Sequence, residues 1–205
     1  MLDSIAIKVL NRPLHIVAGI FKKIGIRKDM VTLSGFFLGL VAIIFLSFNL
    51  YNVALVFILL NRIFDGIDGA LAKITKPTDS GGFLDITLDF IFYSGVVFGF
   101  ALADPGKNAI PACFLLVSFM GTGASFLAFS IMAEKNHIKS MKYPNKSLYY
   151  LQGLVEGTET IIFFILFCLF PDFFYWLAIL FAILCWITTC LRIFFGYRTI
   201  QKMQQ

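Results

Sequence analysis

Six apolar stretches, each long enough to cross a lipid bilayer, follow one another along the sequence. They lie near residues 31–51, 53–73, 82–103, 109–133, 148–170 and 173–195. A transmembrane helix needs about 20 mostly apolar residues. Of the 205 residues, 59% are hydrophobic and only 14% are charged, and a soluble domain of this length could not bury so much apolar surface. We therefore predict an all-α membrane protein with six transmembrane helices.

The Lys and Arg residues gather in alternate connecting segments. Residues 1–30, the loops that follow the second and fourth stretches, and the C-terminal end are all basic, whereas Lys107 is isolated in the loop after the third stretch. Cytoplasmic loops of membrane proteins are enriched in Lys and Arg. The sequence therefore predicts that both termini are cytoplasmic. The pI of 9.0 then reflects membrane topology, and no nucleic-acid partner is expected.

The segment before the first stretch differs from the rest of the chain. Residues 1–30 alternate apolar residues with cations, and the apolar ones are Leu2, Ile5, Val9, Ile16, Ile20 and Ile24. This spacing favours an amphipathic helix at the membrane interface, with Pro13 as a point where it can break. We expect residues 1–30 to form this cytoplasmic interfacial helix and residues 31–205 to form one transmembrane domain.

Four aspartates, Asp65, Asp68, Asp85 and Asp89, lie inside the second and third stretches. A carboxylate near the centre of a transmembrane helix costs roughly 2.5–3.5 kcal/mol, and intramembrane acids usually mark a functional site. The spacing places each pair on one helix face, because the pairs are three and four residues apart. With a rise of about 1.5 Å per residue, both pairs fall at a similar depth on the cytoplasmic side.

Four carboxylates at one depth need cations to neutralise them. Oxygen ligands select hard divalent ions such as Mg²⁺ and Mn²⁺, and four carboxylates suit two ions about 3.5–4 Å apart. Small residues share the same helix faces, namely Gly69, Ala72 and Gly82, and Lys73 ends the face. They can leave room for a bulky phosphorylated ligand, or they can serve close helix packing.

The segment from Asp65 to Asp89 resembles the signature of the CDP-alcohol phosphatidyltransferase family, D-x-x-D-G-x-x-A-R-x8-G-x-x-x-D-x-x-x-D. The chain has D-G-I-D-G-A-L-A-K at Asp65–Lys73, then G-F-L-D-I-T-L-D at Gly82–Asp89. Lys73 stands where the family has Arg, so the charge is kept but the bidentate fork is lost. The six-stretch layout also resembles this family, in a small branch from the inner membrane of Gram-negative bacteria.

The resemblance implies a role for each matching residue. The metal ions would be held by Asp65, Asp68, Asp85 and Asp89, and Asp89 would also act as the general base. The cytidine diphosphate of the donor would contact Asp68, Gly69, Ala72, Lys73 and Gly82. The implied reaction moves a phosphatidyl group from CDP-diacylglycerol, or another CDP-alcohol, to a small alcohol and releases CMP. The resemblance also implies a homodimer.

The acceptor side is less well defined by the sequence. Glu156 and Glu159 lie one turn apart in the fifth stretch, at about the depth of the aspartates, and Arg192 lies near the end of the sixth. These residues can line the acceptor side of a shared cavity. The two glutamates can instead make structural helix contacts, and Arg192 can extend to the interface.

Other functions share part of this pattern. The same chemistry can use a soluble CDP-alcohol with a diacylglycerol acceptor, or water in place of the alcohol, which would make a CDP-diacylglycerol hydrolase. A divalent-cation transporter also carries intramembrane acids, although it needs a polar path across both halves of the bilayer. The acids here gather on the cytoplasmic half, with Asp104 and Asp172 at the opposite ends. The sequence favours a phosphotransferase of phospholipid biosynthesis.

Overall fold

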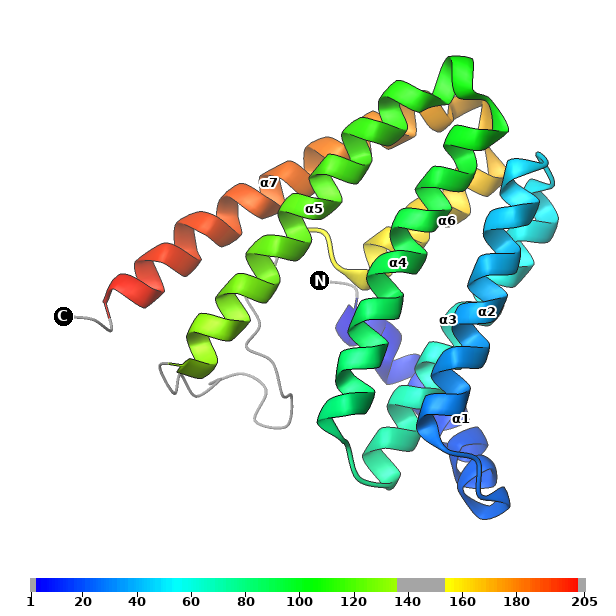
Figure 1. Cartoon of the computed structure of the whole chain (residues 1–205), viewed down its shortest axis with the longest axis vertical. Helices are drawn as coiled ribbons and strands as arrows, with labels where there is room; N and C mark the ends of the chain where they lie inside the picture. Colours follow the sequence, from blue (N-terminus) through cyan, green and yellow to red (C-terminus); the bar gives the residue numbers. More distant parts are fainter. Residues whose placement is uncertain (1–2, 136–153, 203–205) are drawn as a thin grey trace.

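A computed structural model describes residues 3–135 and 154–202 of the chain, with side chains from residue 12 onward. All regular structure in these ranges is helical (Figure 1). The helices are α1 (Asp3–Ile24), α2 (Lys28–Ser47), α3 (Tyr51–Ile74), α4 (Asp79–Ala103), α5 (Pro105–Lys135), α6 (Gly157–Leu169) and α7 (Phe174–Gln201), with a 3-10 helix, η1 (Pro171–Phe173), before α7.

Four of these helices are long and apolar enough to cross a membrane. They are α2, α4, α5 and α7, the last extended by η1, and they agree with the first, third, fourth and sixth predicted stretches. Helix α3 has 24 residues but carries the charges of Arg62, Asp65, Asp68 and Lys73. The structure therefore confirms a multi-pass, all-helical membrane protein, while a total of six spans stays a prediction.

The predicted fifth stretch, residues 148–170, is wrong as one continuous helix. Residues 148–153 lie outside the described part of the chain, and residues 154–156 are not helical. Helix α6 begins only at Gly157 and has 13 residues. Its first turn is closed by Glu159, whose carboxylate accepts a hydrogen bond from the backbone N–H of Glu156 at 3.1 Å. An acid that satisfies a free N–H at a helix start favours this boundary.

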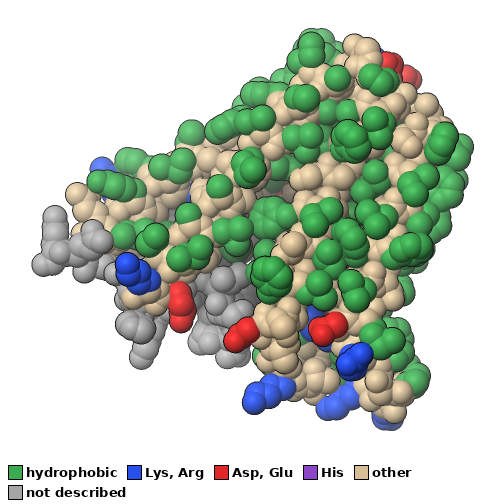
Figure 2. Space-filling view, viewed as in Figure 1, with side chains coloured by type: hydrophobic (Ala, Val, Ile, Leu, Met, Phe, Trp, Pro, Cys, Tyr) green, Lys and Arg blue, Asp and Glu red, His purple; other side chains and the backbone are tan. Residues whose placement is uncertain are grey.

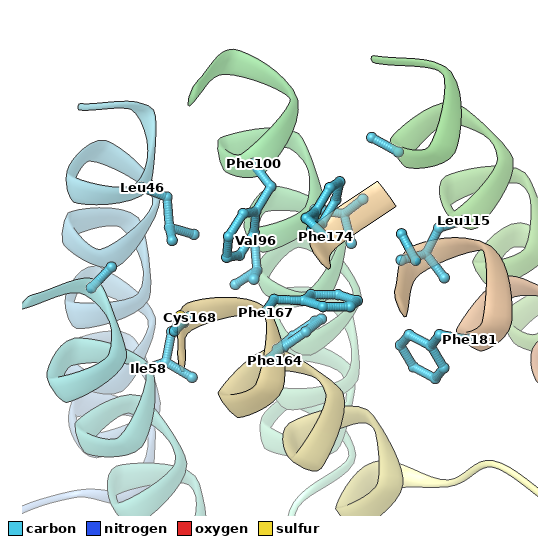
Figure 3. Close-up of a cluster of buried hydrophobic side chains, with 14 of the residues drawn as sticks. Leu46, Ile58, Val96, Phe100, Leu115, Phe164, Phe167, Cys168, Phe174 and Phe181 are labelled. Carbon is cyan, nitrogen blue, oxygen red and sulfur yellow. The ribbon is translucent and has the colours of Figure 1, made fainter. Parts of the chain in front are cut away.

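The hydrophobic core lies at the end of the bundle where α2 ends and α7 begins (Figure 3). Phe100 stacks on Phe174 with ring centroids 4.7 Å apart, and Phe167 meets the edge of Phe174 at 4.9 Å. These rings join α4, α6 and α7. The core is completed by Leu46 from α2, Ile58 from α3 and Leu115 from α5, all fully buried. One aromatic cluster thus holds six helices together at one end.

At the other end the helices separate into two groups. Figure 1 shows α5 and α7 running together away from the group formed by α1, α2, α3 and α4. Helices α3 and α4 both pack closely against α2, but their own backbones make little close contact in the described chain. The gap between them is spanned by side chains, which include the aspartates.

Helix α1 packs against α3 near its C-terminal end. Ala18 is fully buried there, and Leu14 lies so close to Gly66 that a Cβ on this glycine would come within 2.8 Å of it. The Lys22 ammonium donates to the carbonyl oxygen of Ile74 at 2.8 Å, which caps the end of α3 with a cation. Gly25 then turns the chain into α2 with φ +82°, a conformation that favours glycine.

The outer surface of the protein is largely apolar. Figure 2 shows hydrophobic side chains over most of one face, with Lys and Arg gathered toward its lower edge. Large apolar side chains point outward from every long helix, for example Phe37, Phe83, Ile110 and Trp176, each more than 60% exposed. Soluble monomers rarely expose apolar patches of this extent, so this surface suits contact with lipid tails.

Candidate metal site and adjoining cavity

Three of the predicted aspartates meet between α3 and α4. Asp65, Asp68 and Asp85 each present one carboxylate oxygen, and these three oxygens lie within 4.8 Å of one another. The site lies near the C-terminal end of α3 and the N-terminal end of α4, opposite the aromatic core. The convergence expected from the two helical spacings is therefore present for three of the four acids.

Asp68 is the most deeply buried of these acids. It is 1% exposed, and neither of its carboxylate oxygens has a hydrogen-bond partner within the described chain. Buried polar groups are nearly always hydrogen-bonded, and a buried charge needs a partner or a metal. A set of carboxylate oxygens that includes such an unsatisfied pair fits a hard divalent cation. An ion at this site would be held by Asp65, Asp68 and Asp85.

Asp85 also faces a cation from α2. Lys28 Nζ lies 3.6 Å from Asp85 Oδ2 and donates to the carbonyl oxygen of Gly81 at 3.5 Å. The start of α4 is fixed by Thr78, whose hydroxyl accepts from the backbone N–H of Gly81 at 3.2 Å. This N-cap sets where the helix begins, and therefore where the next turn presents Asp85.

Asp89, the fourth acid, is separate from the cluster of three. It lines the same small pocket as the other aspartates, but its Oδ1 accepts a hydrogen bond from Arg62 Nη2 at 2.8 Å. Arg62 Nη1 also lies 3.5 Å from Asp65 Oδ2. The guanidinium therefore links one acid of the cluster with Asp89 across the gap between α3 and α4.

The glycines beside the aspartates border open space, whereas those on α2 lie in close helix contacts. A Cβ added to Gly69 or Gly82 would meet no atom within 4 Å, so helix packing does not require glycine at either position. By contrast, a Cβ on Gly39 would come within 2.6 Å of the Phe92 ring, and one on Gly35 within 2.8 Å of Phe64 Cβ. Close packing thus accounts for the glycines of α2, and open space adjoins those beside the aspartates.

A cavity of about 250 Å³ lies on the other side of α4. Its walls come from α4, α5, α6 and α7, and it is lined by both apolar rings and polar groups. The polar residues in its lining are Tyr93, Ser94, Thr122, Glu156, Thr160 and Arg192. Tyr93 also accepts a hydrogen bond from Arg62 Nη1 at 2.9 Å. Because Arg62 lines the pocket of the aspartates, this hydrogen bond links that pocket to the wall of the cavity.

The three acceptor-side candidates differ in their positions. Glu156 and Arg192 both line the cavity. Glu156 and Glu159 also form a reciprocal capping box at the start of α6, which is a structural helix contact for both glutamates. Arg192 is 8% exposed, donates to the carbonyl oxygen of Thr122 at 3.1 Å and lies over the ring of Phe126 at 5.6 Å. The alternative that Arg192 extends outward to the interface is therefore wrong.

The acids of α3 and α4 thus lie beside glycine backbone that borders open space, next to a cavity with polar and apolar walls, in a bundle with an apolar outer surface. The chain belongs to the CDP-alcohol phosphatidyltransferase family, whose sequence profile matches residues 28–194. Membership supports an enzyme of the CDP-alcohol phosphotransferase type that acts in lipid synthesis at a membrane.

Two known proteins resemble this chain over much of its length. The chain is 52% identical to the inner membrane protein YnjF of Escherichia coli (strain K12) over 192 residues. The aligned region covers 94% of this chain and 93% of that protein. It is 34% identical over 123 residues to the archaetidylinositol phosphate synthase of Pyrococcus horikoshii, which covers 58% of this chain and 64% of that enzyme.

The second glycine of the family motif aligns with Gly81 and not with Gly82. The motif places three residues between its second glycine and the third aspartate, whereas only two separate Gly82 from Asp85. Gly81 has the required spacing, and the segment before it is one residue shorter than in the motif. Gly81 is buried, and a Cβ there would approach Thr78 Oγ1 at 3.0 Å. Gly81 thus packs at the helix start, while Gly82 borders open space.

Three residues of the site, Arg62, Lys28 and Tyr93, have no role predicted from the sequence. Arg62 carried a usable signal, because a cation inside an apolar stretch, three residues before Asp65, is expected to face the same side of the helix. Lys28 and Tyr93 gave no comparable signal. Their contacts depend on how α2 and α4 pack, which no local spacing specifies.

Proposed function

We propose that the protein is a metal-dependent phosphotransferase that moves a phosphatidyl group from CDP-diacylglycerol to an alcohol and releases CMP. The observation that carries the proposal is the buried and unsatisfied carboxylate of Asp68, set among converging acids beside a glycine backbone that no side chain covers. Family membership supplies the reaction type. The choice of a diacylglycerol donor and of a small alcohol acceptor belongs to the proposal.

The proposed metal ligands are Asp65, Asp68, Asp85 and Asp89. Their oxygens suit Mg²⁺ or Mn²⁺, and the separation of Asp89 from the other three acids agrees with two ions rather than one. When bound, such ions neutralise a diphosphate and stabilise the charge of the leaving nucleotide. The lack of any hydrogen bond to Asp68 in the described chain supports a cation at this carboxylate.

The proposed donor site adjoins these acids on α3 and α4. Gly69 and Gly82 border open space, which allows a cytidine diphosphate to approach the backbone. Ala72 lies on the same face of α3, and Lys73 is exposed at its end, where an ammonium can meet a phosphate. Asp68 can accept hydrogen bonds from the donor as well as hold a metal. A lipid donor can reach this site from the bilayer.

Asp89 is the proposed general base. In the transfer step the acceptor oxygen bonds to the phosphorus on the lipid side of the diphosphate, and the bond from that phosphorus to the bridging oxygen breaks. CMP leaves with the bridging oxygen, and the acceptor proton passes to the Asp89 carboxylate. Asp89 lines the acid pocket and is linked through Arg62 to the wall of the cavity, which suits a group that acts between donor and acceptor.

The proposed acceptor site is the cavity lined by Glu156 and Arg192. One carboxylate and one guanidinium, together with the hydroxyls of Ser94, Thr122 and Thr160, suit a small polyhydroxylated or anionic alcohol. Glu159, which caps α6, supports this wall from behind by fixing the start of the helix that presents Glu156.

The membrane arrangement is part of the same proposal. We place the protein in the inner (plasma) membrane of a bacterium with both termini cytoplasmic, as the distribution of Lys and Arg predicts. Residues 1–30 lie at the interface, since Ile16, Ile20 and Ile24 form an exposed apolar row on α1 that can enter the head-group region. Residues 31–205 form the transferase domain, with α3 and α6 proposed as the remaining two of six crossings. A homodimer is proposed from the family resemblance.

Lipid mass spectrometry tests this function directly. Purified protein is incubated with CDP-diacylglycerol, Mn²⁺ and a pool of small alcohols, and the products are analysed together with released CMP. A new phospholipid that forms in step with CMP supports the proposal and names the acceptor. Phosphatidic acid without any added alcohol would identify a hydrolase, and product only from a soluble CDP-alcohol plus diacylglycerol would reverse the lipid role. Mn²⁺ flux into proteoliposomes without CMP release would favour a transporter.

A further inference from the structure

Arg62 stands out because every nitrogen of its guanidinium has a partner. Nε donates to Asn61 Oδ1 at 2.7 Å, Nη1 donates to the Tyr93 hydroxyl at 2.9 Å, and Nη2 donates to Asp89 Oδ1 at 2.8 Å. A planar group with three partners in three directions has a fixed orientation. The family motif begins only at Asp65, so Arg62 lies outside it.

The surroundings of Arg62 hold it from three helices. The guanidinium carbon lies over the rings of Phe92 and Tyr93, at 4.7 and 5.1 Å from their centroids. Asn61 is itself anchored, because its amide donates to the carbonyl oxygen of Gly35 on α2 at 2.8 Å. Hydrogen bonds and cation–π contacts of this kind reinforce each other in a partly buried site.

Arg62 and the residues that hold it restrain Asp89 through one carboxylate oxygen only. Arg62 binds Oδ1, and within the described ranges no hydrogen bond or ion pair reaches Asp89 Oδ2. A charge-assisted hydrogen bond restricts the rotation of the carboxylate and leaves its second oxygen available. The same guanidinium binds Tyr93, which lines the cavity, so the orientation of Asp89 is tied to the position of the cavity wall.

We propose that Arg62 is a positioning residue, which orients the Asp89 carboxylate for proton transfer from an alcohol bound in the adjoining cavity. The inference rests on the proposed function, because it takes Asp89 as the base. A lysine at position 62 would keep the positive charge but could not bind Asn61, Tyr93 and Asp89 at once with a planar fork. Orientation and charge can therefore be separated by substitution.

The alternative role for Arg62 is purely structural, as a brace that joins α3 to α4 and keeps the acids in place. The two roles differ in what they predict for metal binding. A brace is needed for the three acids to converge, so its loss should weaken Mn²⁺ binding. A positioning residue near these acids is not a ligand, and its cation opposes the bound metal. Replacing it should preserve Mn²⁺ affinity or increase it.

The experiment compares Arg62→Lys and Arg62→Gln with the wild-type protein, with Arg198→Gln as the matched control. Arg198 contacts the ring of Phe194 at 4.2 Å, far along α7 from the acids. Mn²⁺ affinity is measured by calorimetry without substrate, and kcat and KM for CDP-diacylglycerol by CMP release. Both Arg62 variants should lose about 100-fold in kcat, since a misplaced catalytic group costs on this order, while donor KM changes less than about threefold.

Mn²⁺ affinity should be unchanged in Arg62→Lys and unchanged or tighter in Arg62→Gln. The Arg198→Gln control should match the wild type in every measurement. Wild-type kcat in Arg62→Lys would overturn the positioning role, because the planar fork would then be unnecessary. A tenfold loss of Mn²⁺ affinity in that variant would also overturn it, in favour of the brace. Failure of the wild-type protein to release CMP with any acceptor would instead refute the proposed function itself.

Discussion

Replacement of Asp68 by asparagine should stabilise the protein without metal, and bound metal should cancel most or all of that gain. Asp68 is 1% exposed, and neither of its carboxylate oxygens has a hydrogen-bond partner within the described chain. A buried unsatisfied polar group costs about 1–3 kcal/mol, and more when it is charged. Asparagine keeps the shape, removes the charge, and brings an amide donor beside the oxygens of Asp65 and Asp85. Metal-free Asp68→Asn should therefore be more stable by about 1–3 kcal/mol.

Saturation with metal should cancel most or all of this gain. At a Mn²⁺ concentration of 100 times Kd, the wild-type protein gains about 2.7 kcal/mol from binding. The variant loses a metal ligand, and we expect its Mn²⁺ affinity to fall about 100-fold. Removing a residue that only hydrogen-bonds to a ligand already costs up to about 100-fold in metal affinity. At the same Mn²⁺ concentration it then gains only about 0.4 kcal/mol. Metal should thus remove most or all of the advantage of the variant.

Thermal unfolding in detergent micelles, with and without Mn²⁺, measures both effects. At this chain length 1 kcal/mol corresponds to roughly 2–4 °C in Tm. Asp79→Asn is the matched control, because Asp79 is an exposed acid at the same end of α4 and its loss should leave the Mn²⁺ shift intact. A variant at Asp68 that melts below the wild type without metal, or one that Mn²⁺ stabilises as strongly as the wild type, would refute the reasoning.

Four further substitutions test the site and the fold separately. Asp89→Asn should lower kcat at least about 100-fold, the usual contribution of a general base, while circular dichroism shows a folded protein; unchanged turnover would exclude Asp89 as the base. Gly69→Leu should fold normally, since a Cβ there meets nothing within 4 Å, but it should raise the donor KM at least about tenfold. Gly39→Leu should instead lower stability by about 1–3 kcal/mol, because a Cβ there meets Phe92 at 2.6 Å. Equal melting temperatures for the two variants would contradict this contrast. Phe167→Ala should cost about 3–5 kcal/mol in thermal unfolding without weakening Mn²⁺ binding, and a loss of metal affinity there would show that the core and the acid site are coupled.

Periodicity and length were sufficient to predict much of the fold. The first, third, fourth and sixth stretches became α2, α4, α5 and α7, because a run of about 20 apolar residues has few alternatives to a helix. The start of α6 was missed for a physical reason. Leu154 and Val155 are apolar, so hydropathy alone extends the stretch across them. The hydrogen bond between the Glu159 carboxylate and the Glu156 backbone instead favours a helix that starts at Gly157.

The acids of the candidate site were predicted by their spacing, and their partners were not. Helical phase places Asp65 and Asp68 on one face, and Asp85 and Asp89 on another, so their approach follows from two adjacent helices. The bond from Arg62 to Asp89 depends on the relative height of α3 and α4 to within about one residue. That height is fixed by packing on α2 and by the Thr78 cap, which act across the fold.

The division of the bundle at the acid end separates two kinds of evolutionary change. The three clustered acids belong to α3 and α4, whereas α5, α6 and α7 supply most of the cavity wall. Mutations on those three helices can therefore reshape the cavity for a larger, smaller or differently charged ligand without moving the clustered aspartates. A lineage built on this scaffold can diversify its products while it inherits the same reactive centre.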